Sequence, residues 1–371
     1  ERRGTERRGT ERRGTERRGT ERRGTERRGT EGDGTEGDGT EGDGTEGDGT
    51  EGDGTEGDGT EGDGTEGDGT EGDGTEGDGT EGDGGRRRGT ERNLSITILL
   101  IFFMTKAITI EQIYHSLLLS GVDNPLQEAR WMHEIAQERG IDAAQLAKWV
   151  RRRCNGEPFQ YIVGTTQFYS IELEVGAGVL IPRPETEILV DLALERLKSA
   201  NSGGKVLDLC TGSGAIPLAM ANERPDFDYT GVDLSEMALK WARRNCDRLK
   251  PRNCHFRLGD LFSPVGREEK FILITANPPY VSVEEYQQLD PVVKDYEPRM
   301  ALEAGDKGLA VARRIAAEAP DFLLPGGTLI MEIGDTQGDE MRGCLKKLGY
   351  HEVTVHADLA GRDRFVSGRI A

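Results

Sequence analysis

The residues Val206-Leu207-Asp208-Leu209-Cys210-Thr211-Gly212-Ser213-Gly214 give the clearest sign of the architecture of this chain. A short apolar strand, 206–210, runs directly into a loop with two glycines, and a helical pattern follows from residue 215. Glycine adopts backbone angles that other residues avoid and lets a ligand come close to the main chain. Open α/β sheets bind ligands outside the carboxyl ends of their strands. The stretch therefore predicts a ligand-binding loop at the edge of a parallel sheet.

Three aspartates near the ends of predicted strands indicate which ligand the loop binds. Asp208, in the first strand, suits a cationic amino-acid group, either directly or through water. Asp233 ends the next strand, 19 residues after the last glycine of the loop, where an acid accepts hydrogen bonds from ribose hydroxyls. Asp260 ends the third strand, beside the expected place of a nucleobase. Acids in this register fit a nucleoside that carries an amino acid and no phosphate, so we expect S-adenosylmethionine as the cofactor.

Other ligands are excluded by the same sequence. Pro217 stands where a dinucleotide fingerprint needs a third glycine, and no G-K-[ST] of a P-loop follows. The chain has five cysteines and five histidines, without a C-x-x-C pair or a His/Cys spacing typical of metal sites. We therefore expect free or buried thiols in a reducing compartment and no bound metal.

The motif Asn277-Pro278-Pro279-Tyr280 follows the fourth predicted strand and indicates the reaction. The Asn277 side-chain oxygen and the Pro278 carbonyl can accept both hydrogens of a planar –NH2 group, and Tyr280 offers a flat surface for it. Such a nitrogen is a poor nucleophile because its lone pair is delocalised. Two acceptors would orient it and favour the charge that develops as it attacks a methyl group. The motif therefore predicts methyl transfer to an amide or amino nitrogen.

Strands and helices alternate from Lys205 onward, which predicts a mostly parallel sheet with helices on both faces. The last two strands are joined only by D-L-A-G-R-D-R, so they must pair antiparallel, as a hairpin at the sheet edge. The predicted strands are 206–210, 229–233, 255–258, 271–276, 328–333, 353–356 and 365–370. The predicted helices between them are 215–223, 236–248 and 307–323.

Three short amphipathic helices are expected ahead of the sheet. Thr109 and Gln112 have the spacing of a capping box at the start of the first one. The second helix is predicted over 125–139, ending at a glycine, and the third over 143–153. Residues 165–184 alternate like β-structure, with glycines at two positions, and predict a β-hairpin linker that includes a strand at 179–181.

The first 85 residues have no apolar side chain. They are copies of E-R-R-G-T and E-G-D-G-T, and we predict that 1–93 is disordered because nothing in it can offset chain entropy. The whole chain carries −20, of which 1–85 contributes −16 and 86–103 contributes +3, which leaves −7 for 104–371. A negative net charge over residues 104–371 argues against non-specific nucleic-acid binding.

Residues 94–103 form an apolar run that is too short for a membrane span of ~20 residues. A perfect five-residue period implies a tandem DNA repeat read in frame, and sequence of a different quality begins at Met104. We therefore expect 1–103 to be dispensable and not native. The competing interpretation is an acidic tether with 94–103 as a weak membrane or partner anchor.

Several motifs together resemble one family, the peptide chain release factor glutamine methyltransferases. The glycine loop and N-P-P-Y are typical of class I methyltransferases, which have a Rossmann-like fold, and the wider match spans essentially all of 104–371. Its further segments are G-E-P-F-Q-Y-I-V-G (156–164), L-I-P-R-P-E-T-E (180–187), E-P-R-M-A-L-E-A-G (297–305) and G-R-D-R-F-V-S-G-R (361–369). The resemblance implies a helical substrate-recognition domain (104–164), a hairpin linker (165–184) and a seven-stranded catalytic domain (185–371).

The resemblance also implies roles for residues. Cys210, Thr211, Gly212, Ser213, Gly214 and Asp233 would hold the cofactor, Asp260 and Leu261 would flank its adenine, and Asn277–Tyr280 would hold the substrate amide beside it. Cys210 stands where many relatives have glycine, and Leu261 where some have an aromatic residue. The substrate would be the glutamine in the Gly-Gly-Gln loop of release factors. We expect a cytoplasmic monomer that binds no nucleic acid stably and no membrane.

Two other functions use the same residues. A methyltransferase for amino groups of adenine or cytosine would need the same N-P-P-Y chemistry, but the chain has no recognition domain rich in Lys and Arg. A binding protein that had lost catalysis would not need an intact N-P-P-Y. Arg151-Arg152-Arg153 could contact an acidic partner, although the end of a helix also favours solvated basic residues.

Overall fold

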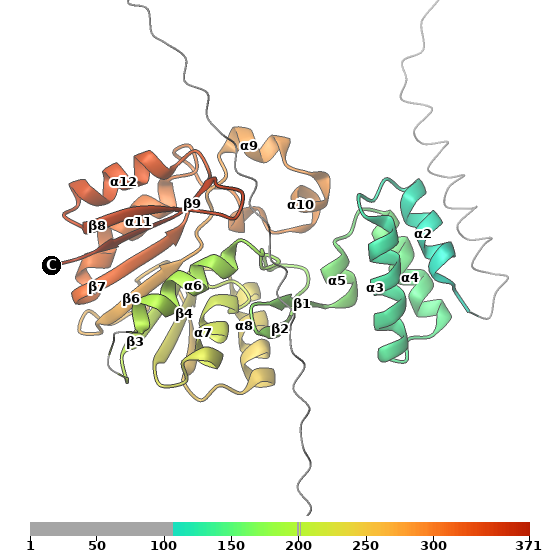
Figure 1. Ribbon diagram of the computed structural model, residues 1–371, viewed down its shortest axis with the longest axis horizontal. Helices are drawn as coiled ribbons and strands as arrows, with labels where there is room; N and C mark the ends of the chain where they lie inside the picture. The colour runs from blue at the N-terminus through green and yellow to red at the C-terminus, as the bar shows by residue number, and fades with distance from the viewer. Residues whose placement is uncertain (1–106, 199, 201) are drawn as a thin grey trace, which may run out of the picture. The chain divides into compact units, whose positions relative to one another are not determined.

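The computed structural model describes residues 107–198, 200 and 202–371, and its largest element is a sheet of seven strands with helices on both faces (Figure 1). The strands are β3 (Lys205–Leu209), β4 (Asp228–Asp233), β5 (Cys254–Leu258), β6 (Phe271–Ala276), β7 (Leu323–Glu332), β8 (His351–Ala357) and β9 (Asp363–Arg369). The repeats, the apolar run 94–103 and Met104 lie outside the described residues, so the expectations for them stay predictions.

The order of the strands is β5-β4-β3-β6-β7-β9-β8. Neighbouring strands from β5 to β7 are parallel, whereas β9 is antiparallel to both β7 and β8. The prediction of a mostly parallel sheet with an antiparallel hairpin at its edge is confirmed. The position of β9 between β7 and β8 makes it the one reversed strand of this sheet.

Alternate residues along each strand supply two cores. The helices concerned are α6 (Thr186–Leu197), α7 (Ala215–Glu223), α8 (Glu236–Leu249), α11 (Ala310–Glu318) and α12 (Gly338–Lys347). Leu329 and Met331 of β7 pack with α11 and α12 on one face, and Ile330 packs with α6 and α7 on the other. Because side chains alternate across a strand, the apolar runs of the sequence bury both faces.

Several elements differ from the prediction. The helix expected over 307–323 is shorter, because Asp306, Lys307 and Gly308 have positive φ and a 3₁₀ turn follows at Ala319–Asp321. Helix α12 was not predicted, because its ten residues include two glycines and only a few apolar side chains. The short helices α9 (Val283–Gln288) and α10 (Pro291–Tyr296) were also missed, since six residues show no periodicity.

The hairpin linker is also shorter than predicted. It consists of β1 (Thr165–Phe168) and β2 (Ile171–Glu174), which pair antiparallel. The strand expected at 179–181 is wrong: those residues form a non-strand segment that lies along a cavity described below. Their apolar pattern reflects packing rather than strand pairing, because Val179 and Ile181 are buried in a cluster with Tyr161, Val175 and Ala238.

The amphipathic helices expected near the start of the described chain are present. They are α2 (Ile110–Leu119), α3 (Pro125–Glu138) and α4 (Ala143–Cys154), joined by the short α5 (Phe159–Val163). Thr109 and Gln112 form the predicted capping box. Ile113, Leu117 and Met132 are fully buried in the bundle core, so its amphipathic pattern explains its packing. None of the helices in the described part of the chain is long and apolar enough to cross a membrane.

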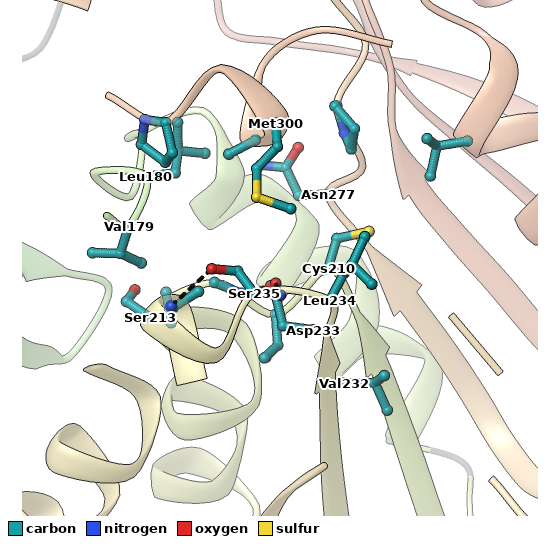
Figure 2. Close-up of a pocket in the computed structure, with 18 of the residues that line it drawn as sticks. Val179, Leu180, Cys210, Ser213, Val232, Asp233, Leu234, Ser235, Asn277 and Met300 are labelled. Atoms are coloured by element: carbon teal, nitrogen blue, oxygen red, sulfur yellow. Dashed lines mark hydrogen bonds between the residues drawn. The ribbon is translucent and has the colours of Figure 1, made fainter. Parts of the chain in front are cut away.

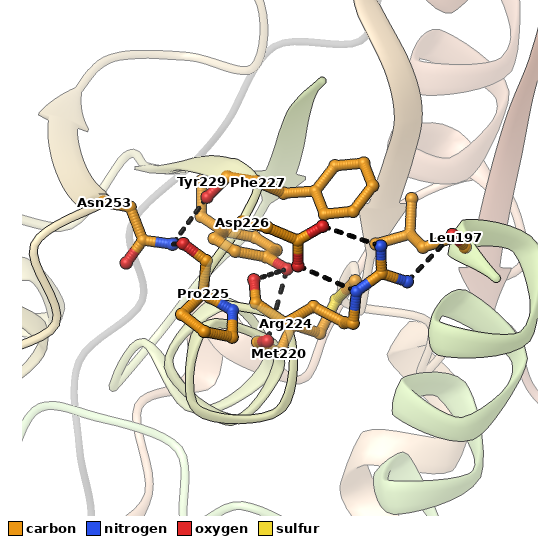
Figure 3. A network of polar contacts seen from close by, with 8 residues as sticks. All are labelled: Leu197, Met220, Arg224, Pro225, Asp226, Phe227, Tyr229 and Asn253. Atoms are coloured by element: carbon orange, nitrogen blue, oxygen red, sulfur yellow. Dashed lines mark hydrogen bonds and ion pairs between the residues drawn. The ribbon is translucent and has the colours of Figure 1, made fainter. Parts of the chain in front are cut away.

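A polar network fastens the amino-terminal end of β4 (Figure 3). The Arg224 guanidinium donates to both Asp226 carboxylate oxygens, at 2.8 and 2.9 Å, and to the Leu197 carbonyl at 2.9 Å. Asn253 donates to the Phe227 carbonyl at 2.5 Å. These bonds tie α6 and α7 to the amino-terminal end of β4. Asp233 lies at the other end of this strand, so the network does not cover the carboxyl ends of the strands, where a ligand is expected.

Candidate active site

A cavity lies where β3, β4 and β6 end, and it collects most of the residues that the sequence singled out (Figure 2). Figure 2 shows Asp233 and Ser235 below the cavity and Asn277 and Met300 above it. The predicted site residues that line it are Cys210, Thr211, Gly212, Ser213, Asp233, Asp260, Leu261, Asn277 and Pro279. Asp208, Gly214, Pro278 and Tyr280 are not among the lining residues.

The glycine loop has the backbone angles that its sequence suggests. Gly214 has φ of +78° and precedes α7, and a Cβ there would lie 2.9 Å from the Phe256 ring. Cys210 has φ of +57° although it is not glycine. An L-residue in this region costs roughly 1–2 kcal/mol, so the backbone at this position favours glycine over cysteine. Burial raises the pKa of the Cys210 thiol, so the group stays protonated.

Asp233 joins the glycine loop to the loop after β4. Its Oδ2 accepts from the Gly212 amide at 2.8 Å, and its Oδ1 accepts from the Ser235 amide at 2.8 Å. Burial raises the pKa of this carboxyl, while the backbone amides oppose the change. An ionised carboxylate has about four lone-pair sites, so each oxygen can accept one more hydrogen bond. The arrangement suits a pair of neighbouring hydroxyl groups.

Asp208 lies beneath the loop rather than in the cavity. Its side chain is fully buried, and Oδ1 accepts from the Thr275 hydroxyl at 2.7 Å. Its Oδ2 has no hydrogen-bond partner among the described residues. Burial raises the pKa of Asp208 to about 7. Asp208 is thus buried and is not among the residues that line the cavity, and its predicted contact with the cofactor, directly or through water, stays a prediction.

We expect Asp208→Asn to change how stability depends on pH. The folded chain holds a proton on Asp208 up to about pH 7, whereas the unfolded chain releases it near pH 4. Between these values the wild-type free energy of unfolding falls as pH rises, because only the folded state binds the proton. The asparagine variant has no carboxyl at this position, so its free energy of unfolding lacks this dependence on pH. Its free energy of unfolding minus that of the wild type should rise by up to about 1.4 kcal/mol per pH unit over this range, then level off.

Urea unfolding of both proteins at several pH values between about 5 and 8 measures this difference. Asp228→Asn is the matched control, because Asp228 lies at the exposed start of β4. If the difference in free energy of unfolding between Asp208→Asn and the wild type stayed constant with pH, the pKa of Asp208 would not be raised in the folded protein.

The charges around the cavity fit S-adenosylmethionine. Among the described residues that line it, Arg314 is the one basic side chain, and it donates to both oxygens of Asp260 at 2.9 and 3.2 Å. Asp233 adds negative charge, whereas Glu303 is paired with Arg299 at 2.7 Å, and the buried Leu261 adds an apolar surface. No basic group is thus left for a phosphate, while a cationic sulfonium or amino group is favoured.

The side-chain amide of Asn277 is held in one orientation. Its Nδ2 donates to the Thr186 hydroxyl at 3.2 Å, and that hydroxyl donates to Glu332 at 2.7 Å. Both Thr186 and Glu332 are buried. No described residue donates to Asn277 Oδ1, so this acceptor is available to a ligand in the cavity.

The rest of the N-P-P-Y turn is fixed by residues that sequence reasoning missed. Gln337 donates to the Tyr280 carbonyl at 2.9 Å and accepts from the Gly334 amide at 2.9 Å. Gly308 has φ of +83°, and a Cβ there would lie 2.0 Å from the Tyr280 carbonyl oxygen. Burial and the nearby Glu332 charge raise the pKa of Tyr280, so its hydroxyl stays neutral. The ring of Tyr280 lies beside Glu332 rather than along the cavity.

Two segments that sequence reasoning left without a role cover the cavity. Leu180 and Pro182 line it from one segment, and Pro298 and Met300 from the other. The buried Glu297 carboxylate joins the segments, because it accepts from Arg183 at 2.5 Å and from the Ile181 amide at 3.0 Å. The strings L-I-P-R-P and E-P-R-M were visible in the sequence, but nothing in them shows that they meet.

A mostly parallel seven-stranded sheet with this cavity and an N-P-P-Y turn defines the class: an S-adenosylmethionine-dependent methyltransferase. A family described as "Methyltransferase small domain" matches residues 186–295. The release factor glutamine methyltransferase from Thermodesulfovibrio yellowstonii is 44% identical to this chain, over 62% of this chain and 82% of that protein. The one from Vibrio cholerae is 41% identical, over 67% of this chain and 91% of that protein. The chain belongs to the release factor glutamine methyltransferase family.

A solved structure offers a further comparison. The protein-(glutamine-N5) methyltransferase (release factor-specific) from Alicyclobacillus acidocaldarius is 30% identical to this chain. The match covers 53% of this chain and 98% of that protein, with a TM-score of 0.33.

Proposed function

We propose that this enzyme methylates the side-chain amide nitrogen (N5) of the glutamine in the Gly-Gly-Gln motif of peptide chain release factors. The observation that carries the proposal is the orientation of Asn277. Its Nδ2 is bound by Thr186, which leaves Oδ1 as an acceptor at the cavity. An acceptor there suits a planar –NH2 group that must be held beside a methyl donor.

The reaction requires a weak nucleophile to be held and polarised. Asn277 Oδ1 and the Pro278 carbonyl would accept the two amide hydrogens, and this favours the positive charge that develops on nitrogen. Bound S-adenosylmethionine supplies an electron-poor methyl group on a sulfonium, and the electrons of the broken carbon–sulfur bond stay on sulfur. The methylated nitrogen would then lose one of its two hydrogens to water as a proton, which leaves a neutral N-methyl amide. Pro279 lines the cavity and fixes the turn, while Tyr280 supports the turn from behind.

The cofactor would lie along the loops after β3, β4 and β5. Asp233 would accept from the ribose hydroxyls, and the 210–214 loop would follow the amino-acid part. Leu261 would contact the adenine ring, with Asp260 held beside it by Arg314. Asp208 would act indirectly, through its position under the loop.

A release-factor glutamine and the bases adenine and cytosine all carry a planar –NH2 group that this site could hold. Transfer of a labelled methyl group distinguishes the protein substrate from the nucleic-acid substrates. The enzyme is incubated with tritiated S-adenosylmethionine and, in parallel, with release factor, double-stranded DNA or RNA. Label on the release factor and none on nucleic acid is the expected result. Label on adenine or cytosine instead would show that N-P-P-Y serves a base methyltransferase here.

We also propose that the helical part, 104–164, recognises the protein substrate. A glutamine side chain offers few atoms, so selection of one loop of one protein needs a larger contact surface. The bundle has its own core, which includes Ile113, Leu117 and Met132. The exposed Leu119 and Trp131 remain available for contact on this bundle.

Deletion of 104–156 is therefore expected to preserve cofactor binding and to lower transfer to intact release factor strongly. The deletion retains Tyr161, because its hydroxyl donates to the Val179 carbonyl beside the cavity. Calorimetry with S-adenosylhomocysteine measures cofactor-site integrity, and methyl transfer measures recognition. Transfer at the wild-type rate by the shortened chain would refute the assignment.

We further propose that the enzyme is a monomer and that it acts in the cytoplasm, where release factors terminate translation. Its acidic body, −7 over 104–371, supports the expectation that it binds no nucleic acid stably. Gel filtration with light scattering measures the oligomeric state; a dimer at working concentrations would contradict this part.

A further inference from the structure

The role proposed for Asn277 depends on which way its amide points. A terminal amide has an acceptor oxygen and a donor –NH2 group of almost the same shape. With the oxygen toward the cavity, the residue can accept from a substrate –NH2. Turned by half a rotation, it would present a donor to a donor. Something in the protein must therefore fix the orientation.

We infer that Thr186 and Glu332 are positioning residues that fix the Asn277 amide with its oxygen toward the substrate. This inference rests on the proposed function, because it assigns Asn277 the task of accepting from the substrate amide. Thr186 begins α6 and Glu332 ends β7, so the two elements meet behind the N-P-P-Y turn. Neither residue was singled out from the sequence.

The direction of the hydrogen bonds carries the argument. A threonine hydroxyl has one proton, and an ionised Glu332, which the nearby Arg364 charge favours, can only accept it, at 2.7 Å from Oε2. The Thr186 oxygen can then only accept from Asn277, and it does so from Nδ2 at 3.2 Å. A rotated amide would set Oδ1 against the Thr186 oxygen with no proton between them. The chain of bonds thus allows one orientation and disfavours the other.

Burial strengthens the preference of this relay, the hydrogen-bonded chain Asn277–Thr186–Glu332, for one orientation of the amide. The exposed fraction is 4% for Thr186, which lines the cavity, and 1% for Glu332, which does not, so the bond between these two residues is shielded from water. An unmade hydrogen bond in such a place is costly, which raises the penalty for rotating the amide. The cost of holding a carboxyl this deep in the protein is difficult to explain by stability alone.

Thr186→Val tests the relay because it removes the hydroxyl and keeps the shape. We expect kcat for methyl transfer to fall about tenfold, as for loss of one buried hydrogen bond, while the Kd of S-adenosylmethionine stays within about twofold. Thr186→Ser should restore the rate, since it keeps the hydroxyl. Thr328→Val is the matched control: Thr328 is a buried threonine of the same strand as Glu332 and does not line the cavity.

A double-mutant cycle separates positioning from a general structural effect. If Thr186 acts through Asn277, then Thr186→Val should have no further effect on kcat once Asn277 is alanine. An equal fall in both backgrounds would overturn the inference. So would a wild-type rate for Thr186→Val.

A readout without substrate keeps the inference testable by itself. The Asn277 side-chain –NH2 signals in a ¹⁵N spectrum, assigned by their loss in Asn277→Ala, should shift and exchange faster with water in Thr186→Val but not in Thr328→Val. Unchanged signals would refute the relay even if methyl transfer is observed. Shifted signals with no transfer to release factor from the wild type would instead refute the proposed substrate.

Discussion

Asn277→Ala is expected to lower the rate of methyl transfer by about 10²–10³. The variant removes the acceptor that orients the substrate nitrogen, and the amide then loses one of the two contacts that favour its attack. Binding of S-adenosylmethionine should stay nearly intact, because the ribose and adenine positions belong to Asp233 and Leu261 at the ends of other strands. A loss in kcat without a loss in cofactor affinity is the signature of a group that acts on the nucleophile.

Single-turnover transfer to release factor and calorimetry with the cofactor measure the two quantities. Asn253→Ala is the matched control: the Asn253 side-chain amide also donates a hydrogen bond within the protein, but it does so to the Phe227 carbonyl, in the network at the end of β4 opposite Asp233. The control should lower stability and leave kcat unchanged. Near-wild-type turnover in Asn277→Ala would mean that N-P-P-Y is only a turn in this protein.

Asp233→Ala should weaken S-adenosylmethionine binding at least tenfold. Hydrogen bonds to a charged group contribute about 1.5–3 kcal/mol each, and the variant removes the acceptor for two ribose hydroxyls. The structure adds a second reason: the same carboxylate holds the Gly212 and Ser235 amides, so the alanine variant also loosens two loops of the site. The expected change is therefore in Kd more than in the chemical step.

Calorimetric titration with S-adenosylmethionine measures this effect directly. Asp228→Ala, at the other end of the same strand, provides the control and should bind as the wild type does. If Asp233→Ala kept the wild-type affinity, the cofactor would have to lie elsewhere in the cavity.

The ends of the strands could be predicted from the sequence because the chemistry there is local. The residues from Val206 to Gly214 combine a strand and its glycines directly before a helix, and Gly212 and Gly214 have the positive φ that glycine allows. Asp233 is the last residue of β4 and Asn277 directly follows β6, so parallel pairing brings them to the same edge. That Asp208 is buried and not among the residues that line the cavity could not be predicted, because strand alternation alone does not show that Thr275 binds its side chain from the neighbouring strand.

The parts that could not be predicted depend on contacts between distant segments. Thr186, Glu332 and Gln337 carry no local signal of a role, and each acquires one from a partner at least 57 residues away. The segments around Leu180 and Met300 could not be placed over the cavity for the same reason. Cys210 is a different case: its positive φ is strained for a cysteine, and the sequence at that position suggests no such angle.

The central claim is that the methyl group reaches one atom, the side-chain nitrogen of a release-factor glutamine. Mass spectrometry of the Gly-Gly-Gln peptide, after release factor has been incubated with the enzyme and S-adenosylmethionine, tests it most directly. The account predicts a gain of about 14 mass units (one CH₂) on the glutamine, with fragment ions that place it on the side chain, and a gain about 10²–10³ times slower with Asn277→Ala. An unmodified glutamine, or a methyl group on another residue of the release factor, would contradict the account.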